Sequence, residues 1–346
     1  MLTTGGNMRV TDSIRVAILG AVLLLCAACD FDAPQSSELA ERDAIANQVT
    51  ALLKNERFED LDTLADSYRS GQARTSSGLW KLSLFYFGLE KMLPRQQHSP
   101  EIWALLGQPV EHWIERRPES PTAHLAYATM LINQAWGIRG TGYAKTVPQP
   151  KWEPFHAKVE EARAYLERVK FIASIDPQWY TAMLDIATLQ DWPEAKYSAL
   201  LAEGLDRHPL YYEMYFSAIY RNLPKWGGDA EKVEAIARNA VERTRASEGS
   251  GLYARIYWVA SASQFGDDLF ATSRVDWAEM KRGIDDVLAQ YPDDWNLNHF
   301  AKFACLAGDH AKAAELIDRI EGEPLPAVWG ASFYLERCRL LGMIAG

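Results

Sequence analysis

A glycine-rich segment holds the residues best suited to binding a charged group. Residues 137–142 read Gly-Ile-Arg-Gly-Thr-Gly, with Trp136 before them and Tyr143 after them. A guanidinium such as that of Arg139 receives carboxylates through paired hydrogen bonds, and it stacks on neighbouring aromatic rings. The interpretation that the sequence favours is structural: Arg139 pairs with an internal carboxylate or caps helix carbonyls, and so pins the loop. The segment lacks the Gly-x-Gly-x-x-Gly order and follows a helix, which argues against nucleotide binding.

A second candidate surface lies in the C-terminal region, where Asn296 and His299 are three positions apart. Leu297 and Phe300 are expected to point into the core, so the two polar residues share another face of the same helix. The concave wall of a helical-repeat protein serves as its binding surface. A peptide-binding pair is therefore one hypothesis, and a solvated helix face is the alternative that the sequence favours.

Signatures of the common hydrolases are missing from the chain. It contains no His-Glu-x-x-His, no Gly-x-Ser-x-Gly, no Walker loop and no pair of Cys-x-x-Cys motifs. Metal-dependent, serine-dependent and nucleotide hydrolysis therefore lack their usual support. Adjacent acidic residues such as Glu160-Glu161 project about 100° apart on a helix, so neighbours cannot act on one substrate. We predict no catalytic residue, no metal site and no cofactor.

The composition predicts an acidic, well-packed protein. The formal net charge is −10, and 48% of the residues are hydrophobic, including 12 Trp, 15 Tyr and 12 Phe. An acidic surface repels phosphate backbones, so nucleic acid is not an expected partner. Aromatic residues at helical spacing are interpreted as core rather than as a carbohydrate platform. Trp226-Gly227-Gly228 is likewise interpreted as a helix stop rather than a ligand-stacking group.

Apolar residues follow the 3.6-residue period through almost every segment, which predicts an all-α fold. Residues 37–56 and 58–69 are expected to form the first antiparallel hairpin. Pro121, Pro177 and Pro209 follow helices and open new ones, as proline at a helix N-terminus does.

The clearest repeat unit pairs two helices around a turn at residues 308–309. Its apolar spacing resembles that of a tetratricopeptide repeat, with Ala301 and Ala313 small enough for close helix packing. We predict an irregular tetratricopeptide-like helical-hairpin array, a curved α-solenoid. It is expected to form one domain over residues 38–346, with a split at residues 148–150 as the alternative.

Two cysteines near the C-terminus, Cys305 and Cys338, are separated by 33 positions. An oxidising compartment would permit a disulfide between them, which would stabilise the fold by roughly 3–4 kcal/mol through loop closure. The alternative is a pair of buried free thiols on separate helices.

The first 29 residues are organised like a secretory signal. Basic residues precede an uncharged apolar run over residues 16–28, which ends at Ala-Ala-Cys29. The run is shorter than the roughly 20 apolar residues that span a membrane, so we expect cleavage. The pattern resembles a bacterial lipoprotein. This resemblance implies a signal peptide over residues 1–28, acyl groups on Cys29 and a tether over residues 29–37.

The residue after this cysteine, Asp30, bears on the choice of membrane. In lipoproteins of enterobacteria an aspartate at this position resembles the signal for retention in the inner membrane. The sequence therefore favours the inner membrane facing the periplasm, with the outer membrane as the alternative, and the lipid anchor as the membrane contact.

Five stretches carry a further resemblance, at residues 78–82, 85–86, 135–144, 223–228 and 295–301. They are similar to segments of a bacterial family of helical proteins of unknown function that carry tetratricopeptide-like repeats. The resemblance implies the fold, and it implies no activity, ligand or site residue.

The favoured hypothesis is a membrane-tethered, non-catalytic helical-repeat protein that binds a protein or peptide partner at the bacterial cell envelope. It rests on the extended surface that such folds build and on an anchor that confines the protein near its partners. The alternative is an envelope enzyme acting on cell-wall or glycan material. Such an enzyme would need a deep pocket with perturbed ionisable groups, expected near Arg139, Tyr143 and His299.

Overall fold

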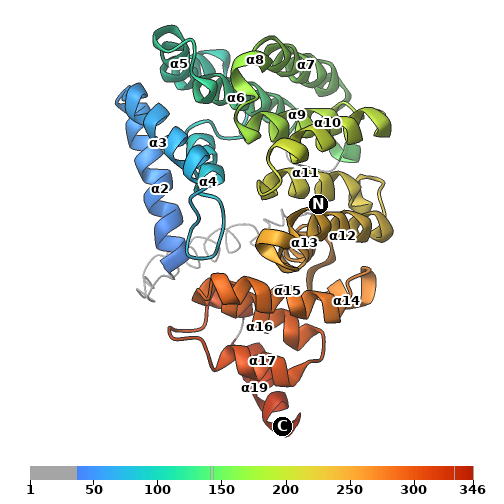
Figure 1. Ribbon diagram of the computed structural model, residues 1–346. Coiled ribbons are helices and arrows are strands. Elements are labelled where there is room, and N and C mark those ends of the chain that lie inside the picture. The colour runs from blue at the N-terminus through green and yellow to red at the C-terminus, as the bar shows by residue number, and fades with distance from the viewer. Residues whose placement is uncertain (1–36, 141, 143, 331, 346) are drawn as a thin grey trace, which may run out of the picture. The chain divides into compact units, whose positions relative to one another are not determined.

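Helices make up most of the described chain, which comprises residues 37–140, 142, 144–330 and 332–345 of the computed structural model. The only β-pairing among these residues is an isolated antiparallel bridge between Arg74 and Trp80. The predicted all-α helical array is confirmed (Figure 1). None of the described helices combines the length and apolarity needed to cross a membrane. The signal-like segment, Cys29 and Tyr143 lie outside the described residues.

In the first half of the described chain, two helices begin directly after an N-capping side chain. Ser120 and Asp176 accept hydrogen bonds from backbone N–H groups of the first turns of α6 and α9, and a proline follows each of them. The helices are α2 (Ser37–Lys54), α3 (Phe58–Gly71), α4 (Lys81–Met92), α5 (Pro100–Arg116), α6 (Pro121–Arg139), α7 (Trp152–Arg168), α8 (Lys170–Ala173), α9 (Pro177–Leu189) and α10 (Glu194–Arg207).

The second half of the described chain is also helical, but one helix does not begin where the sequence predicted. Pro209 does not open a helix: α11 begins at Tyr212, because the Tyr211 N–H bonds the His208 carbonyl in a turn. The helices are α11 (Tyr212–Asn222), α12 (Ala230–Glu248), α13 (Gly251–Ala260), α14 (Leu269–Thr272), α15 (Trp277–Gln290), α16 (Asp294–Leu306), α17 (His310–Ile317), α18 (Pro326–Trp329) and α19 (Ser332–Ala345).

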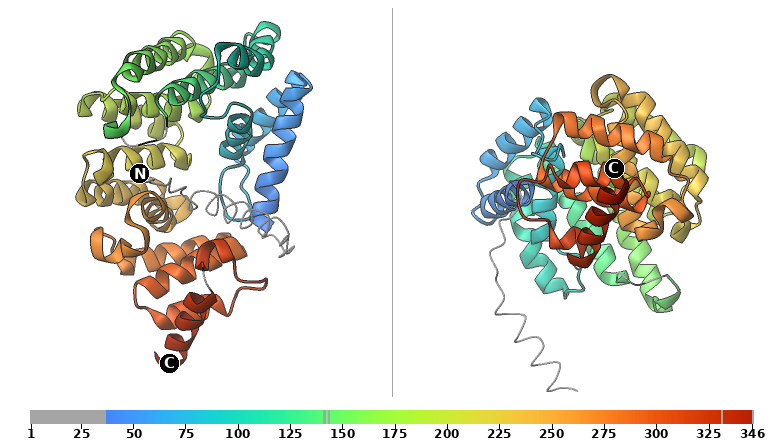
Figure 2. Two further views of the ribbon diagram at one scale, coloured as in Figure 1. Left: turned by 180° about the vertical axis from the view of Figure 1, so that it is seen from behind. Right: turned by 90° about the horizontal axis from the view of Figure 1, so that it is seen from below.

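Neighbouring helices pack as antiparallel pairs, and each pair lies against the next. The contacts run from α6 to α7, α9 to α10 and α11, α12 to α13, α13 to α15, and α16 to α17 (Figure 2). In the last of these pairs Ala301 and Ala313 are fully buried, as the close approach of two helices requires. The predicted C-terminal hairpin is therefore present.

The loop between α3 and α4, residues 72–80, ties the N-terminal helices to distant parts of the array. We call it the inner loop. The carbonyl of Ser77 accepts hydrogen bonds from Arg255 Nη2 at 2.7 Å and from Asn296 Nδ2 at 3.0 Å. Gly78 has a φ of +88°, and a Cβ added there would lie 2.5 Å from Arg255 Nη2. The loop thus reaches α13 and α16, about 180 and 220 positions further along the chain.

The C-terminal helices are joined covalently. Cys305 on α16 and Cys338 on α19 form a disulfide with their Cα atoms 5.8 Å apart. The crosslink closes the loop that contains α17 and α18.

Candidate functional site

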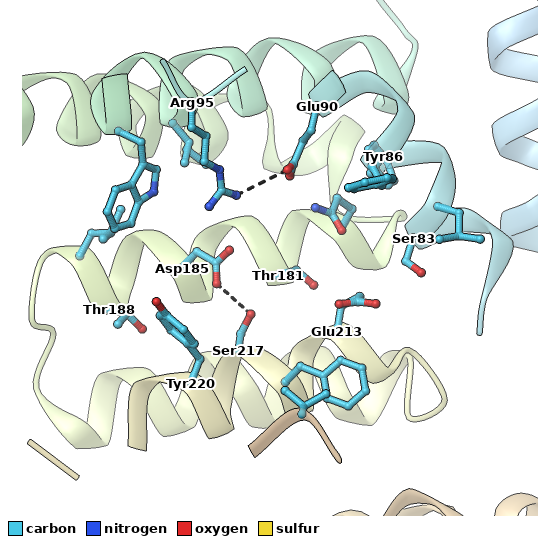
Figure 3. A pocket seen from close by; sticks show the side chains of 18 of the residues that line it. Ser83, Tyr86, Glu90, Arg95, Thr181, Asp185, Thr188, Glu213, Ser217 and Tyr220 are labelled. Atoms are coloured by element: carbon cyan, nitrogen blue, oxygen red, sulfur yellow. Dashed lines mark hydrogen bonds and ion pairs between the residues drawn. The ribbon is translucent and has the colours of Figure 1, made fainter. Parts of the chain in front are cut away.

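A cavity of about 490 Å³ lies where α4, α6, α9 and α11 face one another (Figure 3). We call it the acidic cavity, because three carboxyl groups line it. Its lining residues are Arg42, Leu79, Ser83, Leu84, Tyr86, Phe87, Glu90, Arg95, Ile132, Trp136, Gln178, Thr181, Asp185, Thr188, Leu189, Glu213, Phe216, Ser217, Tyr220, Trp226 and Val259. The volume is in the range typical of small-ligand sites.

Helix geometry explains why α9 turns polar side chains toward this space. Thr181, Asp185 and Thr188 are spaced by four and three positions, so they lie on one face of α9. The opposite face of the same helix carries buried apolar residues such as Met183 and Ile186. The polar stripe is therefore a separate surface from the core-facing stripe.

The same spacing recurs on the two helices opposite. Helix α11 presents Glu213, Ser217 and Tyr220, and α4 presents Ser83 and Glu90 together with aromatic residues between them. Figure 3 shows these side chains directed into one space from three helices. The cavity wall is therefore built from one face each of α9, α11 and α4.

Two of the three carboxyl groups have no basic partner among the described residues. Asp185 accepts a hydrogen bond from Ser217 Oγ at 2.8 Å, and neither Asp185 nor Glu213 forms an ion pair with any residue that the structure describes. Glu90 differs, because Arg95 Nη2 lies 3.6 Å from its carboxylate. The cavity thus holds two acidic groups that have no cation in direct contact.

Burial perturbs the proton affinity of these groups. It raises the pKa of Asp185 to about 6, although the Ser217 hydrogen bond acts in the opposite direction. It raises the pKa of Glu213 to about 7, and the neighbouring acids Asp185 and Glu90 raise it further. Desolvation of a carboxylate favours its neutral form. Near neutral pH both carboxyl groups can therefore gain or lose a proton.

A buried hydroxyl and several aromatic rings complete the lining. Thr181 is only 7% exposed, and its Oγ1 has no hydrogen-bond partner among the described residues. The rings of Tyr220 and Trp226, which also line the cavity, pack with their centroids 5.5 Å apart. An unsatisfied buried hydroxyl is costly unless a ligand or water bonds it.

A buried network holds α4 against α9 on one side of the cavity. Asp176 accepts hydrogen bonds from Tyr86 Oη at 2.6 Å and from Arg69 Nη2 at 2.6 Å, and it also caps α9 through the Gln178 N–H. Burial, together with the adjacent Asp176, raises the pKa of Tyr86 well above its ordinary value. Since Tyr86 also lines the cavity, this network fixes part of the wall.

The structure encloses Arg139 rather than exposing it. The side chain is 7% exposed, and Nη1 donates to the carbonyls of Gly140 and Gly142, each at 2.9 Å. Its guanidinium lies over the rings of Trp136 and Trp152 at 5.1 and 5.4 Å. This arrangement matches the loop-pinning interpretation. Of the residues predicted around it, Trp136 lines the acidic cavity, whereas Arg139 does not.

Asn296 and His299 do not form the accessible pair that the sequence indicated. Asn296 is 0% exposed because the inner loop covers it, so the solvated face expected from the spacing was wrong. His299 stacks on Trp258 at 4.0 Å and on Trp295 at 4.6 Å. Burial lowers its pKa to about 3, so the imidazole stays neutral. Neither residue lines the acidic cavity.

The acidic cavity itself was missed in the sequence because its residues are scattered over four helices. A signal was present: Thr181, Asp185 and Thr188 repeat at i, i+4 and i+7 within an otherwise apolar helix. Polar residues at that spacing inside a buried helix need a polar neighbour or a cavity. Within the described part of the chain, no three His, Cys, Asp or Glu side chains gather closely enough to hold a metal ion.

Comparison with known proteins covers part of this site. Residues 45–194 match a family described as "Domain of unknown function (DUF4034)". The matched span includes Glu90 and Asp185, whereas Glu213 lies beyond it. No curated protein and no solved structure matched the chain.

Proposed function

We propose that this protein is a lipid-anchored, tetratricopeptide-like repeat protein that binds a protein or peptide partner at the bacterial cell envelope. In this proposal the acidic cavity receives part of the partner. The observation that carries it is the cavity of about 490 Å³, lined by three carboxyl groups and by aromatic side chains from several helices. Large aromatic side chains are the groups that most often anchor protein interfaces.

The envelope location rests on two independent features. The N-terminal segment ending at Cys29 has the organisation of a lipoprotein signal, and Asp30 favours the inner membrane facing the periplasm over the outer membrane. The disulfide between Cys305 and Cys338 supports an oxidising compartment, since disulfides persist there and are rare in the cytosol. Metabolic palmitate labelling of the parent and of Cys29→Ala tests the anchor, and equal labelling of both would contradict it.

Site-specific photo-crosslinking in intact cells tests partner binding at the cavity. Phe87 lines the cavity and is 50% exposed, so benzoylphenylalanine at that position faces an entering partner. Phe171 on α8 is 96% exposed and lies outside the lining, which makes it the matched control. The expected result is a discrete adduct from position 87 that position 171 does not give. Identical adducts from both positions, or none from position 87, would count against the proposal.

A second candidate function has one specific observation in its favour. Asp185 and Glu213 keep raised pKa values in an aromatic-lined cavity, which is how a general acid for glycan cleavage is prepared. An envelope enzyme acting on cell-wall or glycan material would therefore use these two residues. Release of new reducing ends from purified peptidoglycan, lost in Asp185→Asn and Glu213→Gln, would favour this function over simple binding.

A further inference from the structure

The charged groups around Asp185 and Glu213 leave an unmatched negative charge. The titratable groups that face the two carboxyls are Arg42 on α2, Tyr86 and Glu90 on α4, Arg95 after α4, Tyr197 on α10 and Tyr220 on α11.

Both arginines among them are already engaged. Arg42 Nε lies 2.6 Å from Glu38, and Arg95 Nε donates to Asn133 at 3.0 Å while its Nη2 lies near Glu90. Neither arginine forms an ion pair with Asp185 or Glu213, although the charge of Arg95 acts to lower the pKa of Asp185 and that of Arg42 acts to lower the pKa of Glu213. The two acids therefore lack a cation in direct contact.

The uncharged residues of the lining, like the two carboxyl groups, are suited to a positively charged ligand. The Oγ1 of Thr181, without a partner among the described residues, is a hydrogen-bond acceptor inside the cavity wall. The ring of Tyr220 already attracts one cation, because Lys225 Nζ lies 4.6 Å from its centroid. That ammonium donates to the Ser263 carbonyl and does not line the cavity, so it does not neutralise the carboxyls. Aromatic faces bind ammonium and guanidinium groups through the ring quadrupole.

We infer that the acidic cavity recognises a cationic side chain of the partner, an alkylammonium or guanidinium group that pairs with Asp185 and Glu213. This inference rests on the proposed function and names the chemistry of the group that the cavity takes. A bound cation stabilises the ionised carboxylates, so binding releases protons when it begins from partly protonated groups. Affinity for the cation therefore rises with pH through the range in which Asp185 and Glu213 ionise.

Calorimetric titration of the full chain in detergent with two capped tripeptides tests the inference. Acetyl-Gly-Lys-Gly-amide carries the ammonium, and acetyl-Gly-norleucine-Gly-amide has the same carbon chain without it. The lysine peptide is expected to bind at least tenfold more tightly than the norleucine peptide at pH 8, and at least tenfold more weakly at pH 5 than at pH 8. Proton release should appear as a dependence of the binding heat on the ionisation enthalpy of the buffer.

Variants assign the effect to the cavity. The double variant Asp185→Asn, Glu213→Gln is expected to lose at least tenfold in affinity for the lysine peptide. Glu115→Gln removes an exposed carboxylate outside the lining and should leave the affinity unchanged. Circular dichroism shows whether the double variant is folded, and the norleucine comparison on the parent protein needs no variant.

The outcomes separate this inference from the proposed function. Equal affinity for both peptides, or binding of neither at millimolar concentration, overturns the inference that the cavity recognises a cationic group. If the photo-crosslink at position 87 is still obtained, the proposal that a partner binds at the cavity stands without a cationic group. If a neutral peptidoglycan fragment binds and the lysine peptide does not compete with it, the inferred cationic ligand is also overturned and the glycan enzyme is favoured.

Discussion

The carboxylate of Asp176 lies 2.6 Å from the phenol oxygen of Tyr86, which joins the N-terminus of α9 to the middle of α4. The same carboxylate oxygen also receives the guanidinium of Arg69 from α3. One buried acid therefore connects three helices and positions a side chain of the cavity wall. This link makes the stability of the fold and the shape of the acidic cavity depend on one network.

Removing the acid of this network should be costly. Asp176→Ala is expected to lower the free energy of unfolding by about 3–5 kcal/mol, because it removes the buried acceptor of both Arg69 and Tyr86 and leaves Arg69 only its more exposed ion pair with Asp66 and a hydroxyl. Tyr86→Phe removes one hydrogen bond to a charged group and should cost about 1.5–3 kcal/mol. Urea unfolding followed by circular dichroism measures both values. Asp206→Ala breaks an exposed ion pair with Arg243 and serves as the control, with an expected change below about 1 kcal/mol. Equal losses in Asp176→Ala and the control would contradict the network.

A methyl group at Gly78 should disrupt the inner loop. Its φ of +88° disfavours any other residue, and a Cβ would lie 2.5 Å from Arg255 Nη2 and 2.6 Å from Tyr291 Cδ2. Gly78→Ala is expected to destabilise the fold by about 1–3 kcal/mol. Gly71→Ala is the matched control, because a Cβ there meets no atom within 4 Å. Thermal unfolding of the two variants side by side decides the question, and an unchanged midpoint for Gly78→Ala would show that the loop does not constrain α13.

The two unpaired carboxyls should make stability fall as the pH rises. Burial raises the folded-state pKa of Asp185 to about 6 and that of Glu213 to about 7, above the unfolded values of about 3.9 and 4.3. Between roughly pH 4 and pH 7 the folded chain therefore binds more protons than the unfolded chain, and these groups oppose folding once they ionise. Asp185→Asn and Glu213→Gln should each stabilise the protein at pH 8 by on the order of 1–3 kcal/mol relative to their effect at pH 4.

Parallel urea titrations at the two pH values measure this difference. Glu115→Gln supplies the baseline for losing an exposed carboxylate, since its side chain lies outside the cavity. A variant effect that is the same at both pH values would mean that the carboxyls titrate normally.

Local periodicity was enough to predict the fold class and the starts of several helices. The 3.6-residue pattern and the residues at the starts of α6 and α9 are local features, and the structure has helices beginning at Pro121 and Pro177. The acidic cavity depends instead on which helices face one another. No local pattern states that Glu213 lies opposite Glu90, because that proximity follows from how the inner loop and α4 meet α11.

The polar residues chosen from the sequence illustrate the same limit. Asn296 was assigned to an accessible face from the positions of Leu297 and Phe300, and helix geometry does separate these faces. The face was nevertheless covered, because Ser77 arrives from 219 positions away and accepts a hydrogen bond from the amide. Burial by a distant segment is a tertiary property that the spacing within one helix does not contain.

The crosslink between Cys305 and Cys338 should stabilise the C-terminal helices. Closing a loop with a sequence separation of 33 restricts the unfolded chain, which corresponds to about 3–4 kcal/mol in the loop-entropy estimate. The double variant Cys305→Ser, Cys338→Ser is expected to lose that amount in urea unfolding. A reducing agent should destabilise the parent by a similar amount and leave the double variant unaffected. If the reductant changes neither protein, the two thiols are not bridged.

Arg139 should hold the loop that follows α6 closed against a protease. Its Nη1 donates to the Gly140 and Gly142 carbonyls, and the guanidinium packs on Trp136 and Trp152, so the loop and the start of α7 share one anchor. Arg139→Met keeps a long apolar stem but removes both hydrogen bonds and the charge, and it should cost about 1–3 kcal/mol of local stability.

Limited proteolysis with a lysine-specific protease measures this opening, because Lys145 lies in the exposed part of the loop. Cleavage after Lys145 is expected to accelerate by roughly fivefold or more in Arg139→Met, since each 1.4 kcal/mol of local opening is a tenfold change in the open population. Lys54, at the end of α2, supplies an internal reference whose cleavage should not change. If Arg139 served instead to receive a carboxylate from a partner, the substitution would leave the cleavage rate at Lys145 unaltered and would reduce only partner capture.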